Sequence, residues 1–151
     1  MCMNKLKQLW HRKKIQRDTT EYSAESVYRV VEEKLKNPNI MPLDSKYKVP
    51  TTQTFKEILR KDATDEIRYI ANFFDCDGFG FLFKAISALD YHINSIGIVI
   101  SYKSAHAFNI VVTEGDYGLE VWKLEPQNDR MWKPNKDEKD KYIVEDQTVL
   151  I

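Results

Sequence analysis

Cys76, His106 and Glu125 are the residues of this 151-residue chain whose types and spacing could do chemistry together. Cys76 stands in the stretch DCDGFGFLFKAIS, where an apolar pattern typical of a helix begins. At a helix start, unpaired backbone N–H groups and the helix dipole stabilise a thiolate, which is the reactive form of cysteine. The flanking Asp75 and Asp77 oppose a negative charge on sulfur, so an activated thiol here needs a nearby cation such as an imidazolium. Asp75 is also expected to cap the helix.

His106 is the histidine that could meet this thiol. His11 lies in a basic N-terminal segment. His92 lies sixteen residues further along the same predicted helix, about 24 Å from Cys76. His106 begins a predicted strand, and we therefore expect it to act as the base.

A predicted hairpin with the turn EGDYG brings a polar partner to His106. If GD forms the two-residue loop, His106 faces Glu125; if DY forms it, His106 faces Gln127. Alternation places His106 on the apolar face that carries Phe108. Cys76, His106 and Glu125 are therefore predicted to form a nucleophile, a base and an orienting carboxylate.

Two other interpretations of these residues stay open. Cys76 and His106 could each be a structural side chain in the core. Cys76, Asp77, His106 and Glu125 could instead bind zinc, but the chain has no closely spaced CxxC or HxxxH pair. We predict no metal and no cofactor.

Composition and charge favour a globular protein without a strong global field. The formal net charge is zero, so neither nucleic acid nor a membrane is expected as a partner. No stretch is apolar enough for a spanning helix or a secretory signal, and the location is expected to be cytoplasmic, or the host cytoplasm if the protein is phage-encoded. Cys2 and Cys76 are expected to stay unpaired. We predict a basic arm over 1–17 and one domain over 18–151.

Hydrophobic periodicity predicts an α+β fold, in which N-terminal helices and a central helix beginning at Cys76 pack on a C-terminal antiparallel sheet. The predicted helices span 23–36, a short segment from Phe55 to a break near Asp62, a segment ending near Phe74, and 76–94. The segment MPLDSKYKVPTTQ is predicted to be an extended loop. The predicted strands span 97–102, 106–112 and 119–125, with a last strand over either 142–144 or 148–151.

The blocks DCDGFGF, SAHAFNIVV and LEVWKLEPQND, within residues 47–129, carry a resemblance to a known family. They resemble papain-like and transglutaminase-like cysteine hydrolases. The most similar branch has DCDDFA, HAWN or HAFN, and EPQ blocks, and occurs in small phage and bacterial proteins and in the protease domain of some mushroom lectins. The resemblance implies a papain/transglutaminase-like core and a thiol protease or amidase with Cys76, His106 and Glu125 as its catalytic triad. It implies a peptide, protein or small amide substrate.

The same resemblance matches Asn109 and Gln127 to motif positions, and we expect binding residues at Gln127, Asn109, Asp77 and Gly78. Gly78 and Gly80 stand where the branch has Asp and Ala, which loosens the helix start by about 1 kcal/mol per glycine. An upstream glutamine for an oxyanion hole is not evident, and Gln53 and Asn72 are the candidates.

These departures support an alternative function. The chain would then be a catalytically inactive binding protein on the same fold, for example a phage-encoded inhibitor or ligand-binding protein acting on a host factor. Its contacts with a host protein could come from the basic arm and from the NDRMWKPN segment around Trp132.

Overall fold

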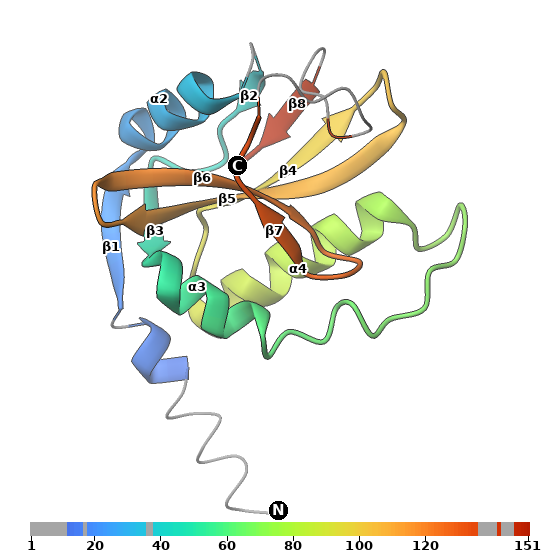
Figure 1. Cartoon of the computed structure of the whole chain (residues 1–151), viewed down its shortest axis with the longest axis horizontal. Coiled ribbons are helices and arrows are strands. Elements are labelled where there is room, and N and C mark those ends of the chain that lie inside the picture. The colour runs from blue at the N-terminus through green and yellow to red at the C-terminus, as the bar shows by residue number, and fades with distance from the viewer. Residues whose placement is uncertain (1–11, 17, 36–37, 136–141, 143–146) are drawn as a thin grey trace, which may run out of the picture.

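A six-stranded sheet with the strand order β2-β8-β4-β5-β6-β7 organises the molecule (Figure 1). The computed structural model describes residues 12–16, 18–35, 38–135, 142 and 147–151. The strands of the sheet are β2 (Asn39–Met41), β8 (Gln147–Leu150), β4 (Ile96–Ser101), β5 (His106–Gly115), β6 (Gly118–Glu125) and β7 (Arg130–Trp132). A second, two-stranded sheet pairs β1 (Thr19–Ser23) with β3 (Lys46–Pro50). The helices are α2 (Ala24–Lys34), α3 (Thr52–Leu59) and α4 (Cys76–Tyr91).

Helices cover both faces of the sheet. In Figure 1, α2 lies above β5 and β6, while α3 and α4 lie below them. On the α2 side, Val27 and Val31 pack with Phe108 and other core residues. On the opposite side, Phe55 of α3 and Phe83 of α4 pack with residues such as Val111. Because alternate side chains of β5 point to opposite faces, this strand is buried on both sides.

The predicted α+β class is confirmed, and so are α2, α3, α4 and the three central strands at the level of their existence and approximate bounds. The sheet is mixed rather than purely antiparallel, because β2 pairs with β8 in parallel. Strand β8 confirms the 148–151 alternative for the last strand. In the other alternative, Tyr142 lies in a turn and residues 143 and 144 fall outside the described residues.

The predicted helix ending near Phe74 is wrong. Residues 60–75 form turns and short irregular segments, and Phe73 is 89% exposed. Asp62 accepts hydrogen bonds from the backbone and hydroxyl of Thr64, a local turn that competes with a helix. The apolar residues of this segment have helical spacing. However, α3 and α4 already cover the face of the sheet on which another helix would pack.

The predicted loop over residues 41–53 is also wrong in part. Lys46–Pro50 forms β3, which pairs with β1 over five residue pairs, from Ser23↔Lys46 to Thr19↔Pro50. This segment is a strand because it pairs with β1, more than twenty residues earlier. The prolines and turn formers within the segment indicated a loop and gave no sign of this partner.

The hairpin between β5 and β6 has Asp116 and Tyr117 as its two-residue turn, with Gly115 opposite Gly118. The register that pairs Asn109 with Leu124, continued three residues beyond the ladder, sets His106 opposite position 127. The DY alternative is therefore the correct one. Glu125 becomes the diagonal neighbour of His106 on the same face, still within reach of a long side chain.

The described part of the predicted basic arm contacts the domain. Residues 12–16 are helical, and Ile15 is buried in the cluster that contains Phe55 and Phe83. Arg12 pairs with Asp90 at 2.9 Å, and Lys14 with Glu57 at 3.6 Å. The division into an arm and one domain stays a prediction.

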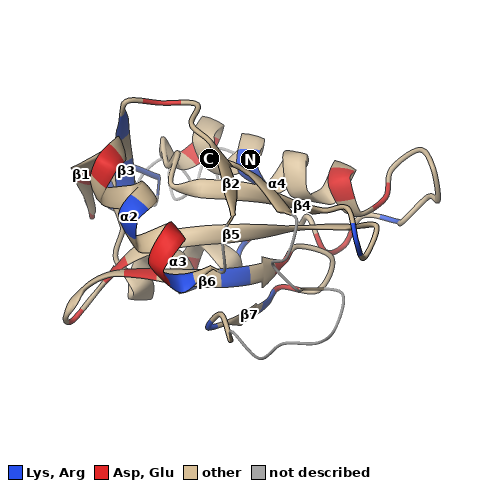
Figure 2. Cartoon of the chain, turned by 90° about the horizontal axis from the view of Figure 1, so that it is seen from above, with Lys and Arg blue, Asp and Glu red and all other residues tan. Residues whose placement is uncertain are grey.

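Charged side chains are interspersed over the elements in the view of Figure 2, with neither sign dominating. Among the described residues, no helix combines the length and the apolar character needed to cross a membrane.

Candidate functional site

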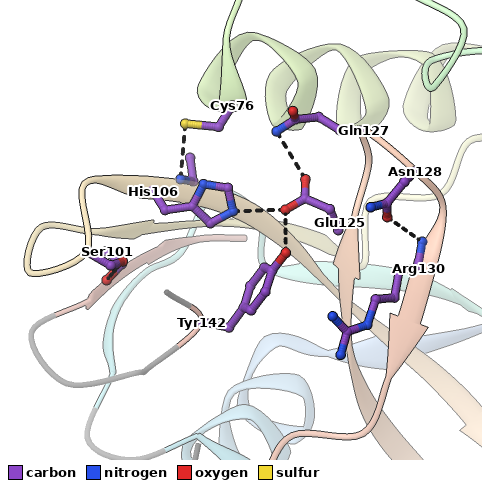
Figure 3. Close-up of polar contacts among 10 residues, drawn as sticks. Cys76, Ser101, His106, Glu125, Gln127, Asn128, Arg130 and Tyr142 are labelled. Carbon is purple, nitrogen blue, oxygen red and sulfur yellow. Dashed lines mark hydrogen bonds and ion pairs between the residues drawn. The ribbon is translucent and has the colours of Figure 1, made fainter. Parts of the chain in front are cut away.

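The thiol of Cys76 lies at the point where α4 begins. Its side chain is partly exposed, and it is a free thiol as predicted. The sulfur accepts a hydrogen bond from the backbone N–H of Ala107 at 3.4 Å (Figure 3). This contact holds the first residue of α4 against the first residues of β5, thirty positions further along the chain.

His106 and Glu125 form a buried pair beside this thiol. Their side chains are 8% and 2% exposed, and imidazole Nε2 lies 2.9 Å from carboxylate Oε2. Figure 3 shows the ring between the thiol and the carboxylate. Because an ionised carboxylate only accepts hydrogen bonds, Nε2 carries a proton, and in the neutral ring Nδ1 keeps its lone pair. The structure thus brings together the three residues predicted from the sequence.

Two further side chains hold the Glu125 carboxylate. The hydroxyl of Tyr142 donates to Oε2 at 2.9 Å, and the amide of Gln127 donates to Oε1 at 3.3 Å. Tyr142 also packs edge-on against the His106 ring, with centroids 5.3 Å apart. Together with the imidazole, these donors orient the carboxylate and support its charge. Gln127, a predicted binding residue, contacts the site through Glu125.

Two buried residues of this site, Tyr142 and Lys123, were not predicted from the sequence. Lys123 is fully buried, and its Nζ donates to the backbone carbonyl of Tyr142 at 2.6 Å. Each has a sequence feature that indicates burial: Lys123 stands at an inward position of the β6 alternation, and Tyr142 is an aromatic residue in a charged tail. Neither feature predicts the contact between Lys123 and Tyr142, because these residues belong to separate segments of the chain.

The side chain of Asn109 points to the opposite face of the sheet from that of His106. Its amide Nδ2 donates to the carbonyls of Gly80 and Gly97, both at 3.1 Å. These bonds tie α4 to β4. The His106 and Asn109 side chains of the HAFN motif therefore point to opposite faces of the sheet. Asn109 links α4 to β4 and does not lie beside the thiol.

The carboxyl groups beside Cys76 interact with each other. A hydrogen bond with Asp77 raises the pKa of Asp75 above its usual value, and the same bond lowers the pKa of Asp77. Asp75 occupies the N-cap position, but its side chain caps nothing and instead accepts from the Asn72 N–H at 3.2 Å. The capping role expected for Asp75 is wrong, because Asn72 competes for the carboxylate. Asp77 accepts from the Gly78 N–H at 2.9 Å.

Tyr69 is a further neighbour of the thiol. Loss of solvent around its hydroxyl, then the negative charges of Asp75, Cys76 and Asp77, raise the pKa of Tyr69. Its ring stacks on Phe79 at 6.4 Å and is 50% exposed. The segment before α4 therefore supplies an accessible aromatic ring near Cys76.

Gly78 and Gly80 differ in what surrounds them. A Cβ at Gly78 would lie 3.0 Å from the Phe74 ring, whereas a Cβ at Gly80 would make ordinary contacts at 3.6 Å or more. Gly80 faces Ile98 and Asn109, so it does not open space over the thiol. Gly78 allows the Phe74 ring to lie against the helix start.

Gly80→Ala is expected to raise the free energy of unfolding by about 0.5–1 kcal/mol, because alanine is the better helix former and its Cβ fits. Gly78→Ala is expected to bring no gain, because the Phe74 ring must move. Urea denaturation of both variants measures the difference. An equal gain in the two would contradict the role given to Phe74.

The oxyanion candidates separate in the structure. Gln53 is exposed on α3, next to Thr52, which bonds to Thr113. Thr113 lies seven residues along β5 from His106, about 23 Å away, so Gln53 is remote from the thiol. Asn72 stays close, through its bond to Asp75.

Two other predicted features can be placed. Trp132 is partly buried and packs edge-on against Tyr142 at 4.7 Å, so it anchors its loop instead of presenting a free surface. In the described part of the chain, no three His, Cys, Asp or Glu side chains are grouped as metal ligands would be.

Comparison with known proteins identifies the fold through solved structures. No family model and no curated protein matches the chain. One similar structure is described as a PSL1a-E64 complex, with a TM-score of 0.65, 21% identity, and coverage of 87% of this chain and 51% of that one. Another is Polyporus squamosus lectin bound to the human-type influenza-binding epitope Neu5Aca2-6Galb1-4GlcNAc. Its TM-score is 0.64 at 23% identity, with coverage of 87% and 49%. The chain spans about half the length of these neighbours.

These neighbours overturn the predicted family. The chain was interpreted as a papain-like or transglutaminase-like cysteine hydrolase, a thiol protease with a catalytic triad, and that interpretation is wrong: the structures that share its fold are a lectin and its complexes. The expected peptide, protein or small amide partner, with a host protein as a further partner, is likewise wrong, since the ligand named for the lectin is a sialylated glycan. Short motifs around Cys76, His106 and Glu125 describe a local arrangement, and the same arrangement can occur in proteins that bind without reacting. The papain/transglutaminase-like core is not confirmed.

Proposed function

We propose that this protein is a binding protein whose ligand site is the surface around the partly exposed thiol of Cys76, where the segment before α4 meets the start of β5. One observation carries the proposal: Cys76 is the partly exposed member of a polar cluster whose other members, His106 and Glu125, are buried. A ligand can therefore reach the sulfur, while the pair behind it is screened from water.

The groups on this surface suit a ligand with hydroxyl groups and an apolar face. Asp75 and Asp77 supply carboxyl oxygens that accept hydrogen bonds. The half-exposed ring of Tyr69 supplies a flat apolar surface with a polar edge. A glycan has both features, and it is the ligand class named for one of the similar structures; E64 is named for the other. Both compounds are the first probes for this site.

Blocking the thiol is expected to abolish binding, while shortening its side chain is not. Calorimetric titration should show that the glycan Neu5Aca2-6Galb1-4GlcNAc or E64 binds the protein, and that Cys76→Ala binds the same compound within about threefold. Protein alkylated with iodoacetamide should lose binding at least tenfold, because the added group covers the surface around the sulfur.

Alkylated Cys76→Ala is the matched control, since it carries any modification of Cys2 and none at position 76. It should bind like the untreated variant. The proposal is contradicted if neither probe binds, or if the alkylated natural protein binds as well as the untreated one.

A second candidate is favoured by the pairing of His106 Nε2 with Glu125, which leaves Nδ1 as the proton acceptor of the neutral ring. In this case Cys76 would open a strained ring of its ligand, such as an epoxide: the S–C bond forms as the ring C–O bond breaks, and the thiol proton passes to Nδ1 and then to the released oxygen. The roles of Cys76, His106 and Glu125 as nucleophile, base and orienting group stay a prediction. Intact-mass measurement after denaturation distinguishes the candidates: a stable adduct that is absent from Cys76→Ala supports covalent chemistry.

A further inference from the structure

A cavity of about 380 Å³ opens on the opposite face of the sheet from the His106–Glu125 pair. It lies between the end of α3, strand β6, and the turn and strand that follow β6. Its apolar lining comes from Leu59, Trp122 and Met131, and its charged lining from Lys56, Arg60 and Asp129. None of Cys76, His106 and Glu125 lines it. The volume is within the range of small-molecule sites, about 300–1,000 Å³.

Asp129 is poorly compensated inside the protein. Its Oδ1 is buried and has no hydrogen-bond partner. Burial, followed by the negative charges of Asp65 and Asp62, raises the pKa of Asp129 to about 7. A carboxylate in this position gains from a cationic donor brought by a ligand, because such a group supplies the charge and hydrogen bonds that the protein does not.

The positive charge on the cavity lining comes from the last turn of α3 and the residue that follows it. Lys56 and Arg60 line the cavity, and within the described part of the chain neither forms an ion pair. Lys56 lies over the Trp122 ring at 5.6 Å from its centroid. These side chains are free to bind an anion, and Arg60 has the fork geometry that suits a carboxylate.

The apolar wall between these charges is held in place. Trp122 Nε1 donates to the Thr113 hydroxyl at 3.0 Å, which fixes the ring and uses its donor. Lys133 lies over the same ring at 3.8 Å and pairs with Glu120 at 3.0 Å. Trp122 therefore offers a ligand apolar contact rather than a hydrogen bond, as do Leu59 and Met131.

We infer that this cavity binds a small zwitterion with an apolar body, of the class of the apolar α-amino acids. The ligand's ammonium meets Asp129, and its carboxylate meets Lys56 and Arg60. Its apolar side chain contacts Leu59, Trp122 and Met131. This inference is independent of the site over Cys76.

Three probes test the charges one at a time. Phenylalanine carries both charges, 3-phenylpropanoate lacks the ammonium, and phenethylamine lacks the carboxylate. Calorimetric titration of the full chain at pH 8 should show phenylalanine binding at least tenfold more tightly than either analogue. Equal binding of all three, or no binding of phenylalanine, would overturn the inference.

Variants locate the binding. Asp129→Asn should weaken phenylalanine binding at least tenfold and leave 3-phenylpropanoate within about threefold. Asn tolerates the positive φ of 55° at this position, so the turn is kept. Arg60→Gln, on the exposed end of α3, should weaken 3-phenylpropanoate and phenylalanine and spare phenethylamine. Asp116→Asn and Arg29→Gln, which make the same changes away from the cavity, should change nothing.

The pH dependence is a separate readout. Asp129 shares the cavity lining with Lys56 and Arg60, and burial with the negative charges of Asp65 and Asp62 raises its pKa to about 7. Phenylalanine affinity should rise severalfold from pH 6 to pH 8, because only the ionised carboxylate pairs with the ammonium. Asp129→Asn should remove this rise. A rise that persists in the variant would assign it to another group and overturn the role of Asp129.

Discussion

Replacing Glu125 by alanine is expected to lower the free energy of unfolding by about 3 kcal/mol. The change leaves the His106 Nε2–H and the Tyr142 hydroxyl without their acceptor, and both side chains are buried. A buried donor that loses its partner costs about 1–3 kcal/mol, and Glu125→Ala leaves two such donors. Urea denaturation monitored by tryptophan fluorescence measures the loss.

Two variants serve as controls for Glu125→Ala. Glu21→Ala removes a carboxylate from an exposed pair with Lys46, whose atoms are 2.7 Å apart, and should cost less than about 0.5 kcal/mol. Glu125→Gln keeps one acceptor oxygen and should cost less than alanine. If Glu125→Ala is no more destabilising than Glu21→Ala, the buried cluster does not contribute to stability as described.

Replacing His106 by asparagine is expected to slow the alkylation of Cys76 by iodoacetamide at pH 7 by about tenfold to a hundredfold. The thiolate is the form that reacts. The helix start and the Ala107 N–H support a negative charge on sulfur, but the charges of Asp75 and Asp77 oppose it. The imidazole is the group that can take the proton of the thiol, and the Glu125 carboxylate stabilises the imidazolium that results. Labelling is followed by mass spectrometry of the peptide that contains Cys76.

His92→Asn is the matched control for His106→Asn. His92 ends α4, sixteen positions from the thiol, and its φ of 56° suits asparagine, so alkylation should be unchanged. Equal alkylation rates in the natural protein and His106→Asn would show that the imidazole does not act on the thiol. Such a result would remove the covalent candidate and leave the binding proposal standing.

The candidate cluster was largely predictable from the sequence. Cys76 opens an apolar helical pattern, and His106 and Glu125 lie on two strands joined by a short turn. The register of that turn was not predictable, because GD and DY are both acceptable two-residue loops. The structure has DY as the loop, and the contact between His106 and Glu125 is diagonal rather than directly cross-strand.

Other parts of the fold depended on distant partners. Strand β3 exists because β1 pairs with it, and residues 60–75 stay irregular although their apolar spacing indicated a helix. Tyr142 joins the cluster through a hydrogen bond across seventeen positions. Local spacing does not encode these contacts, because each needs a surface built by another segment.

The sequence by itself determined the α+β class, the central helix and strands, and the residue types that meet at the start of α4, since periodicity and turn chemistry act over a few residues. Only the tertiary structure decided the hairpin register, the donors on Glu125 and the bridging place of Asn109. It also overturned the hydrolase interpretation of the short motif, because the solved structures that share the fold are a lectin and its complexes. The physical reason is the same in each case. Side-chain burial, strand pairing and the overall fold depend on contacts between distant segments, whereas a motif covers only a few adjacent residues.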